Sequence, residues 1–333
     1  MIYTSGIISD VNKEESLEQL QDNKLAIVCE KIGLREGERM LDIGCGWGTL
    51  TKFASVNYGA HVTGVTLGRN QTAWGNKGLR RAGVEDDQSR ILCMDYRDIP
   101  VPSGGYNKIT CLEMAEHVGV RHLGSFFRQV NSMLDDDGVF FLQIAGLRKD
   151  WQFEDFTWGL FMNKYIFPGA DASTPLGFVV DTLESAGFEI KMVDTIGVHY
   201  SATLWRWYRN WLANKDKVVA KYGVRWYRVR SRMNEREREA LTHVRSGNTS
   251  LPIPRLPRVR ELLLVSRSLA SRISMRFTAS TVLTLNSVLR ARLLPARLGS
   301  QRRRRILRIV AHERSEMCVY HDMVDHTAIT GVL

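Results

Sequence analysis

The sequence predicts an α/β fold organised as a doubly wound, Rossmann-like parallel sheet. The first observation is a short apolar strand at residues 40–43, which runs into the glycine-rich turn 44–48 and then into a helical pattern at 49–58. A strand, a glycine turn and a helix form the first unit of a nucleotide-binding sheet. The second observation is that strand-like and helical patterns alternate as far as the strand at 139–145, which favours parallel strands joined by helices. An aromatic stretch at 147–175 interrupts this alternation before a further helix and strand.

Each element has its own signal in the chain. Residues 14–33 space their apolar side chains as a helix does and end at Gly33, and the helix expected at 69–82 is closed by Gly83. The dipeptide Asp137-Gly138 turns the chain into a strand at 139–145. The other expected strands are 61–67, 89–94, 106–112 and 188–196, and the other expected helices are 120–134, 174–187 and 204–211.

The glycine turn has the spacing G-x-G-x-G, which differs from the G-x-G-x-x-G of dinucleotide enzymes. Asp42 directly precedes the turn, and the stretch resembles motif I of the S-adenosylmethionine (SAM) methyltransferases. A dinucleotide site needs an acid at the end of the second strand to bind ribose hydroxyls, but here that strand runs into 66–71 without one. The absence of this acid weakens the interpretation that the protein is a hydride-transfer enzyme. The amide of Gln71 could bind the ribose in its place.

Charge divides the 333 residues into two parts. Residues 228–333 hold 21 Arg, no Lys and 8 Asp or Glu, an excess of +13. Because the whole chain carries +10, residues 1–227 carry −3. No apolar run approaches the roughly 20 residues of a membrane span, and the N-terminus lacks the pattern of a signal peptide. Five cysteines without paired spacing predict reduced thiols in an intracellular protein, with neither a disulfide framework nor a metal site: Cys29, Cys45, Cys93, Cys111 and Cys318.

Seven stretches, in order along the chain, together resemble the cyclopropane-fatty-acyl-phospholipid synthase and mycolic acid methyltransferase family. They are 3–6 (YTSG), 40–48 (MLDIGCGWG), 66–71 (TLGRNQ), 95–98 (DYRD), 113–119 (EMAEHVG), 163–168 (NKYIFP) and 199–208 (HYSATLWRWY). Within this family the chain looks most like the fungal sphingolipid C9-methyltransferases, because QLQDNKLAIVCEKIGL, GVTLGRNQTAWGN and FPGADASTPLG are similar to that branch.

The resemblance implies a class I SAM-dependent methyltransferase domain over residues 1–227. In the expected site the glycine turn admits the methionine part of SAM, Gln71 binds the ribose, and Asp95-Tyr96 frames the adenine. The expected cofactor contacts are Tyr3, Thr4, Met40, Leu41, Asp42, Ile43, Gly44, Cys45, Gly46, Trp47, Gly48, Thr66, Leu67, Gly68, Arg69, Asn70, Gln71, Tyr96 and Arg97.

The family's shared chemistry starts when a carbon–carbon double bond attacks the SAM methyl group and leaves a carbocation in the lipid. A base then removes a proton, which closes a cyclopropane or leaves a methyl branch; in the family this base is a bicarbonate held by Cys, Glu, His and Tyr. Glu116 and Tyr200 match the Glu and the Tyr, while Ser5 replaces the Cys and Gln143 replaces the His. A serine is compatible if its backbone N–H is the binding group. A glutamine cannot carry charge near neutral pH, so it puts the bicarbonate in doubt or implies a differently tuned base, and by resemblance it favours methyl branching.

The resemblance implies a long-chain lipid substrate and a location inside the cell, peripheral to a membrane. Aromatic residues at 151–167 could line an acyl channel, form a lid or make a satellite core, and their spacing leaves these alternatives open. The helix at 204–211 is crowded with aromatics that could face the same channel or a membrane surface: Trp205, Trp207, Tyr208 and Trp211.

The expected activity is C9 methylation of the sphingoid base of a ceramide or glucosylceramide. One alternative is a cyclopropane synthase that acts on an unsaturated phospholipid. A second alternative is an inactive fragment that binds SAM without transferring its methyl group.

The resemblance ends near Tyr227, where an Arg-rich part begins. Residues 228–333 are expected to be irregular or helical, disordered and separate from the sheet, and Leu251–Pro257 cannot continue a helix. One interpretation is a basic extension that binds nucleic acid or anionic lipid. We favour a frameshift or intron-derived segment, because the switch to Arg without Lys is abrupt, and we expect no nucleic-acid partner. The start at Met1 also looks late, because the family has more chain before the 3–6 stretch, and in the fungal branch that region carries hydrophobic membrane segments.

Overall fold

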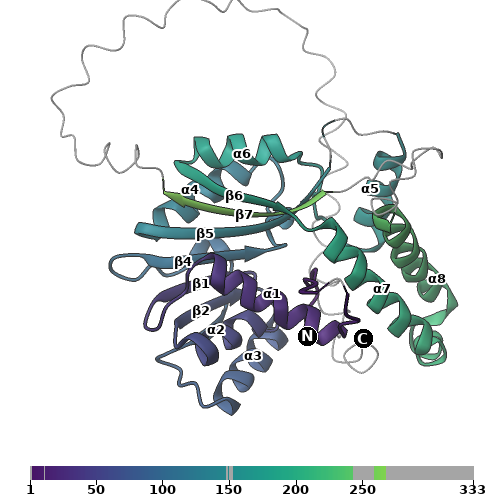
Figure 1. Ribbon diagram of the computed structural model, residues 1–333, viewed down its shortest axis with the longest axis horizontal. Helices are drawn as coiled ribbons and strands as arrows, with labels where there is room; N and C mark the ends of the chain where they lie inside the picture. The colour runs from purple at the N-terminus through teal and green to yellow at the C-terminus, as the bar shows by residue number, and fades with distance from the viewer. Residues whose placement is uncertain (1, 11, 148, 150–152, 243–258, 268–333) are drawn as a thin grey trace, which may run out of the picture. The chain divides into compact units, whose positions relative to one another are not determined.

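A computed structural model of the chain describes residues 2–10, 12–147, 149, 153–242 and 259–267. Within these residues the centre is a seven-stranded sheet in the order β3-β2-β1-β4-β5-β7-β6 (Figure 1). Strands β1 to β5 pair in parallel, and β1 lies between β2 and β4. The strand order therefore reverses at β1 and β4, the position where open α/β sheets bind their ligands beyond the carboxyl ends of the strands. The strands are β1 Arg39–Ile43, β2 His61–Thr66, β3 Arg90–Cys93, β4 Tyr106–Leu112, β5 Leu134–Gly146, β6 Phe188–Thr195 and β7 Val259–Arg267.

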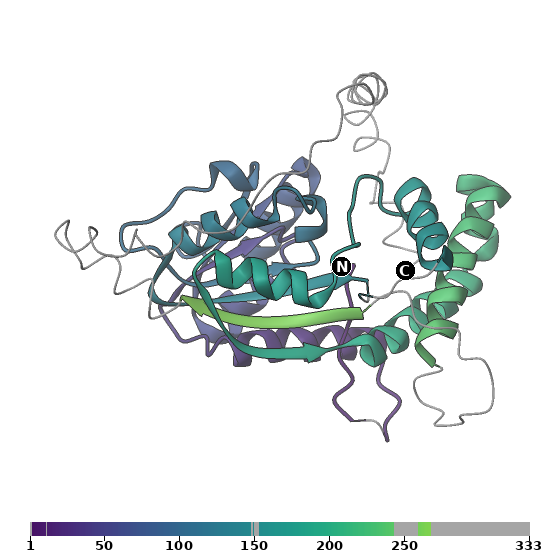
Figure 2. The same cartoon turned by 90° about the horizontal axis from the view of Figure 1, so that it is seen from above.

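Helices cover both faces of the sheet, with α1, α2 and α3 on one face and α4 and α6 on the other (Figures 1 and 2). Thr49–Tyr58 and Tyr106–Leu112 form the elements predicted for them, and the parallel doubly wound sheet predicted from the sequence is confirmed as far as β5. The helices are α1 Leu17–Lys31, α2 Thr49–Tyr58, α3 Arg69–Arg81, α4 Leu123–Met133, α5 Phe153–Tyr165, α6 Leu176–Ser185, α7 Gly197–Ala213 and α8 Lys215–Thr242, with short 3-10 turns η1 Tyr96–Asp98 and η2 Ala115–His117.

The alternation of side chains along each strand divides the core into two layers. On β1, Leu41 and Ile43 pack into the layer under α4 and α6, whereas Met40 packs into the layer under α1 and α2. On β5, Phe140 joins the first layer and Phe141 the second. Asp42 stands two residues after Met40 on β1, and Gln143 stands two residues after Phe141 on β5. Both polar side chains therefore face the layer under α1 and α2.

Helices α5, α7 and α8 form a third group beyond the ends of the strands (Figures 1 and 2). Its buried centre contains Met162 and Ile166, from α5 and the turn after it, and Tyr200, Leu204 and Trp207 from α7. Helix α7 begins at Gly197, seven residues before the helix predicted from its aromatic residues, and follows β6 almost directly. The predicted tyrosine of the site is therefore placed on a helix that leaves the sheet edge.

The last strand that the structure describes corrects one expectation. Strand β7 lies between β5 and β6 and is antiparallel to both, with eight residue pairs from Val139↔Ser266 to Gly146↔Val259 on the β5 side. Helix α8 also crosses the boundary expected after residue 227. The prediction that residues 228–333 stay outside the sheet and lack strands is therefore wrong for Val259–Arg267. The physical reason is that β5 and β6 each present a row of backbone N–H and C=O groups, and one strand between them satisfies both rows.

Candidate active site

The turn between β1 and α2 contains three positions that favour glycine. Gly44, Gly46 and Gly48 have φ angles of 77°, 55° and 75°, where any residue with a Cβ is strained. A Cβ at Gly44 would come within 2.6 Å of Met114, and one at Gly48 within 2.2 Å of the Ile91 side chain. A Cβ at Gly46 would meet no described atom within 4 Å. The outer two glycines therefore serve packing, whereas the backbone at Gly46 is open to a ligand.

Asp42, at the end of β1, is buried beneath α1 and α2. Its carboxylate accepts hydrogen bonds from the hydroxyls of Thr51 (3.2 Å) and Thr110 (3.1 Å). Burial raises the pKa of Asp42 to about 6, against the opposing effect of these bonds and of the Lys24 charge. Lys24 is itself buried in α1, and its ammonium group donates a hydrogen bond to the hydroxyl of Thr4. Lys24 thus interacts with the N-terminal segment through Thr4 and with Asp42 through its charge.

The turn after β2 orients the amide of Gln71. The hydroxyl of Thr66 donates a hydrogen bond to Gln71 Oε1 at 2.7 Å, and a Cβ at Gly68 would lie only 2.5 Å from the same oxygen. Because this oxygen is held inside the turn, the NH₂ end of the amide is the part that can meet a ribose hydroxyl. The remaining predicted contacts of this turn are exposed: Leu67, Arg69 and Asn70.

Tyr96 and Arg97 lie in η1, directly after β3. Tyr96 packs edge-to-face against Phe126 of α4, with the ring centroids 5.2 Å apart. Arg97 is exposed, and its guanidinium group donates to the two carboxylate oxygens of Asp95 at 2.8 and 2.7 Å, which lowers the pKa of Asp95. Of the two predicted residues, Tyr96 is the better placed for a contact with an adenine ring.

The N-terminal segment, residues 2–9, lies between α1 and α7. The carbonyl of Thr4 accepts a hydrogen bond from Gln21 at 2.8 Å. Ser5 is fully buried, and its hydroxyl donates to the carbonyl of Gly6 at 2.8 Å. The N–H of Gly6 donates to the hydroxyl of Thr203 on α7 at 2.9 Å. The Ser5 hydroxyl is thus engaged locally, which leaves its backbone as the group that could bind an anion.

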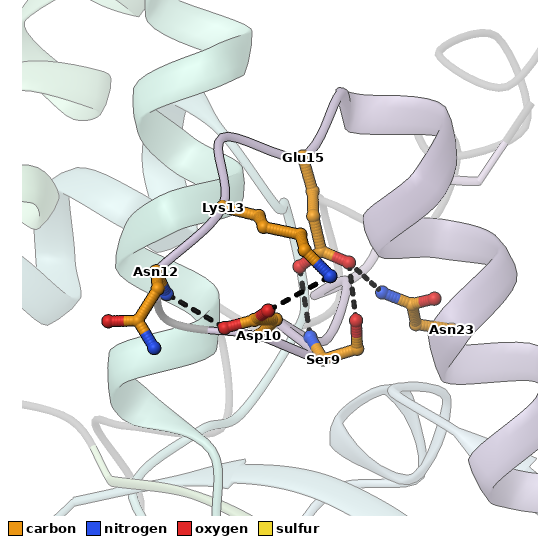
Figure 3. Close-up of polar contacts among 6 residues, drawn as sticks. All are labelled: Ser9, Asp10, Asn12, Lys13, Glu15 and Asn23. Carbon is orange, nitrogen blue, oxygen red and sulfur yellow. Dashed lines mark hydrogen bonds and ion pairs between the residues drawn. The ribbon is translucent and has the colours of Figure 1, made fainter.

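Glu15 holds the far end of this segment (Figure 3). Its carboxylate accepts hydrogen bonds from the N–H (2.9 Å) and hydroxyl (2.6 Å) of Ser9 and from the amide of Asn23 on α1 (2.7 Å). The bond from the Ser9 hydroxyl is the main cause that lowers the pKa of Glu15 to about 2. Asp10 and Lys13 form an ion pair of 3.1 Å across the same loop. The network anchors the segment that carries the first predicted site residues.

Tyr200 lies on α7 and is linked by aromatic rings to the start of the chain. Trp207 packs edge-to-face on Tyr200, with the ring centroids 6.1 Å apart, and stacks on Tyr3 on its other side. Tyr200 is only 4% exposed, so its hydroxyl lies in a protected environment. The predicted tyrosine and the N-terminal segment therefore belong to one packed group.

Two other predicted catalytic residues, Glu116 and Gln143, each form a hydrogen bond near the ends of β4 and β5. Glu116, in η2, is buried and accepts a hydrogen bond of 2.7 Å from the N–H of Ala145. Gln143 lies two residues earlier on β5, is fully buried, and donates a hydrogen bond of 2.6 Å to the carboxylate of Glu113. The predicted catalytic residues thus form two groups, one on η2 and β5 and one on α7 with the N-terminal segment.

Glu113 and Lys24 are not among the predicted site residues, but they form hydrogen bonds with two that are, Gln143 and Thr4. Glu113 directly follows β4, and a side chain at the carboxyl end of a central strand is the signal that could have found it. Lys24 stands four residues from both Leu20 and Val28, which are fully buried, so it interrupts the apolar face of α1. A lysine at such a position needs a buried partner.

The aromatic and apolar side chains of residues 153–167 fall into a buried group and an exposed group. Trp158 stacks on Phe161 with centroids 4.9 Å apart, and both pack against the buried cluster around Tyr200, as a satellite core would. Three other apolar side chains of α5 are exposed: Phe153 (74%), Phe156 (50%) and Leu160 (55%). The tryptophans of α7 also divide, because Trp207 and Trp211 are buried while Trp205 is 39% exposed.

A family model described as mycolic acid cyclopropane synthetase matches residues 1–234 of the chain. The chain is 81% identical over 229 residues to sphingolipid C9-methyltransferase A of Emericella nidulans, a match that covers 69% of this chain and 44% of the relative. It is 68% identical over 235 residues to the sphingolipid C9-methyltransferase of Komagataella phaffii, covering 69% and 48%. The cyclopropane-fatty-acyl-phospholipid synthase of Escherichia coli is 32% identical over 215 residues, covering 65% and 53%. The chain spans about half the length of the curated relatives that it matches.

Solved structures show the same fold. The cyclopropane synthase MmaA2 from Mycobacterium tuberculosis superposes with a TM-score of 0.68 at 22% identity, over 80% of this chain and 90% of that one. The mycolic acid cyclopropane synthase CmaA1, solved with SAH and CTAB, has a TM-score of 0.66 at 22% identity, over the same shares of the two chains. The predicted class I SAM-dependent methyltransferase fold is confirmed. Because the family model matches most of its length and these relatives share its sequence over the same region, the chain belongs to the mycolic acid cyclopropane synthetase family.

Proposed function

We propose that the chain transfers a methyl group from SAM to the double bond of a long-chain lipid, and that this lipid is the sphingoid base of a ceramide or glucosylceramide. The observation that carries the proposal is the identity of 68–81%, over 229–235 residues, to two sphingolipid C9-methyltransferases. Every predicted site residue lies within residues 1–234, which match the family model. Since the matches cover only 44% and 48% of these relatives, the activity and the substrate of the whole protein are part of the proposal.

The glycine turn supports SAM as the methyl donor. When bound, SAM supplies an electrophilic methyl group on a sulfonium centre. The open backbone at Gly46 would hold its methionine part, the amide of Gln71 would bind the ribose, and Tyr96 would pack against the adenine. Two features agree with this placement of SAM. The glycine turn has three positive φ angles, and the end of β2 lacks the acid that a dinucleotide site needs.

Glu116 and Tyr200 would serve the proton transfer that ends the reaction. Both are buried, one at the end of the central strands and one on α7. If the base is bicarbonate, as in the family, then Glu116, the hydroxyl of Tyr200 and the backbone N–H of Ser5 are the groups that would hold it. A carboxylate of the chain itself is the alternative base, because Gln143 replaces the histidine that the family uses.

A membrane surface is the expected source of the lipid. Phe153, Phe156 and Leu160 lie three and four residues apart, so they share one face of α5, and all are at least half exposed. Such a face suits contact with the interfacial region of a bilayer, beside the aromatic cluster that surrounds Tyr200. Among the described residues no helix combines the length and apolar character needed to cross a bilayer.

Isotope labelling tests the proposal. The chain is incubated with SAM carrying a CD₃ group and with vesicles that contain glucosylceramide with an 8-ene sphingoid base or an unsaturated phospholipid, and the lipids are analysed by mass spectrometry. A methyl-branched sphingoid that keeps all three deuterium atoms supports the proposal, because the proton leaves the lipid chain. A cyclopropane that keeps two supports the alternative of phospholipid ring closure, because the third leaves with the base. Binding of SAM without any product identifies an inactive fragment.

A further inference from the structure

Glu113 has an unusual backbone. It is the residue directly after β4, and its φ angle of 56° makes it the only residue other than glycine, among those described, with a positive φ. The left-handed region is unfavourable for any side chain with a Cβ, and such strain gathers at sites where the chain uses it. A glycine would adopt this conformation without strain, so a carboxylate here needs a reason.

Gln143 holds the Glu113 carboxylate in place. The N–H of Glu113 donates to the carbonyl of Gln143 at 2.8 Å, and the Gln143 side-chain amide donates to Glu113 Oε1 at 2.6 Å. Gln143 is fully buried, and its own side-chain oxygen has no hydrogen-bond partner among the described residues. The buried amide orients the Glu113 carboxylate through a short hydrogen bond to a charged acceptor, and its unsatisfied oxygen is a cost that this arrangement carries.

Glu113 lies in a short segment whose neighbouring residues contact both the glycine turn and the end of β5. The next residue, Met114, lies against Gly44 of the glycine turn, where an added Cβ would come within 2.6 Å of it. Glu116, three residues after Glu113, accepts a hydrogen bond from the N–H of Ala145 on β5. Glu113 therefore lies at the carboxyl end of β4, in a segment that also contacts the glycine turn and the end of β5.

We propose that the Glu113 carboxylate is the base that completes methyl transfer, in place of bicarbonate, and that Gln143 is its positioning residue. The inference rests on the proposed function. The alkene π pair forms the new bond to the methyl carbon as the carbon–sulfur bond breaks toward sulfur, which leaves a cation on the neighbouring carbon. Glu113 then takes the proton from the carbon that received the methyl group, and the released C–H pair forms the double bond again. Glu113 supplies the proton acceptor that Gln143 cannot be, because an amide does not accept a proton near neutral pH.

Two variants of Glu113 separate catalysis from structure. Glu113→Gln keeps the size of the side chain and removes the proton acceptor, and Glu113→Gly also relieves the strained backbone. We expect both to lower kcat by about a hundredfold or more, the usual scale for a lost base, with the KM for SAM unchanged. The glycine variant should unfold at the same or a higher temperature. Glu184→Gln, which alters an exposed carboxylate on α6, is the matched control and should leave turnover unchanged.

Bicarbonate and Gln143 provide the remaining readouts. Wild-type turnover should be the same in buffer freed of carbon dioxide and in buffer with added bicarbonate. Gln143→Met, which keeps the volume but removes the donor, should lower kcat without changing the KM for SAM. Full turnover in Glu113→Gly, or a wild-type enzyme that stops without bicarbonate, would overturn the inference while the proposed function stands. If the wild-type protein makes no methylated sphingoid at all, the proposed function fails and takes this inference with it.

Discussion

Tyr3 stacks on Trp207, with ring centroids 5.3 Å and ring planes 13° apart, although 203 residues separate them in the chain. The stack joins the N-terminal segment to α7, which carries Tyr200. Two hydrogen bonds reinforce it: the N–H of Gly6 to Thr203 and the N–H of Ile8 to Nδ1 of His199. A segment expected to contact SAM is thereby attached to the helix expected to act on the lipid.

Removal of the stacked indole should weaken both stability and cofactor binding. Trp207 is only 6% exposed, so Trp207→Ala should lower the free energy of unfolding by about 3–5 kcal/mol. The affinity for SAM should also fall, because the N-terminal segment loses its support. Trp205→Ala changes an exposed residue two positions away on the same helix and should cost about 0.5 kcal/mol or less. Chemical denaturation and titration calorimetry with SAM measure the two effects, and equal losses in both variants would contradict the role of the stack.

The glycine turn can be tested at the position that faces open space. Gly46→Ala should lower SAM affinity by about tenfold or more, which is roughly 1.4 kcal/mol of binding, because the new methyl group occupies the side on which the ligand approaches. Gly48→Ala should also reduce stability, since its Cβ would meet the Ile91 side chain at 2.2 Å. Gly78→Ala on α3 adds a methyl group in open space and serves as the control. Unchanged SAM binding in Gly46→Ala would exclude the turn as the cofactor site.

Glu116 should affect turnover more than cofactor binding. Glu116→Gln retains an oxygen that can accept the Ala145 N–H at 2.7 Å, so the strand end should stay in place. The loss of charge should lower turnover by about a hundredfold or more, with SAM affinity nearly unchanged. Single-turnover kinetics with bound SAM make the comparison. A large loss of SAM affinity with normal turnover of the bound fraction would place Glu116 in the cofactor site instead.

Tyr200 offers a smaller change in the same test. Tyr200→Phe keeps the edge-to-face contact with Trp207 and removes only the hydroxyl. We expect turnover to fall while the unfolding temperature shifts by only a few degrees, consistent with about 1 kcal/mol for one buried hydrogen bond. A large drop in stability at full activity would assign the hydroxyl a purely structural role.

Asp42 should make stability depend on pH. Its pKa is raised from 3.8 to about 6, chiefly by burial, so between these values the folded state binds a proton that the unfolded state has lost. Stability should therefore fall as the pH rises from about 4 to about 6, by about 3 kcal/mol, and then level off. Asp42→Asn should flatten this part of the profile measured by denaturation of the SAM-free protein. A profile that keeps the same slope in the variant would assign the effect to another group.

Strand β7 predicts a difference between two truncations. A chain that ends at residue 242 lacks β7 and leaves the facing backbones of β5 and β6 without the partner that joins them, so its unfolding temperature should fall. A chain that ends at residue 267 keeps β7 and is the matched control. Equal stability of the two would show that β7 contributes nothing to the sheet.

Sequencing of genomic DNA around codon 228 tests the separate prediction that the Arg-rich part is frameshift- or intron-derived. A splice site or second frame that continues the family match past residue 234 would support this prediction.

The local sequence determined most of the sheet and the cofactor turn. Residues 49–58 and 106–112 form the helix and strand that their patterns predict, and the glycines at 44, 46 and 48 all have the positive φ that such a turn requires. These features depend on neighbours within a few positions, because side-chain periodicity and glycine's freedom act along the chain.

Tertiary structure decided what depends on distant partners. The strand at Val259–Arg267 exists because β5 and β6 leave backbone groups to be paired, which no local pattern reveals. Gln143 meets Glu113, and Lys24 meets Thr4, only after strands and helices from separate parts of the chain have packed. A buried polar group takes its role from the partner that satisfies it, and that partner is chosen by the fold rather than by the sequence around the group.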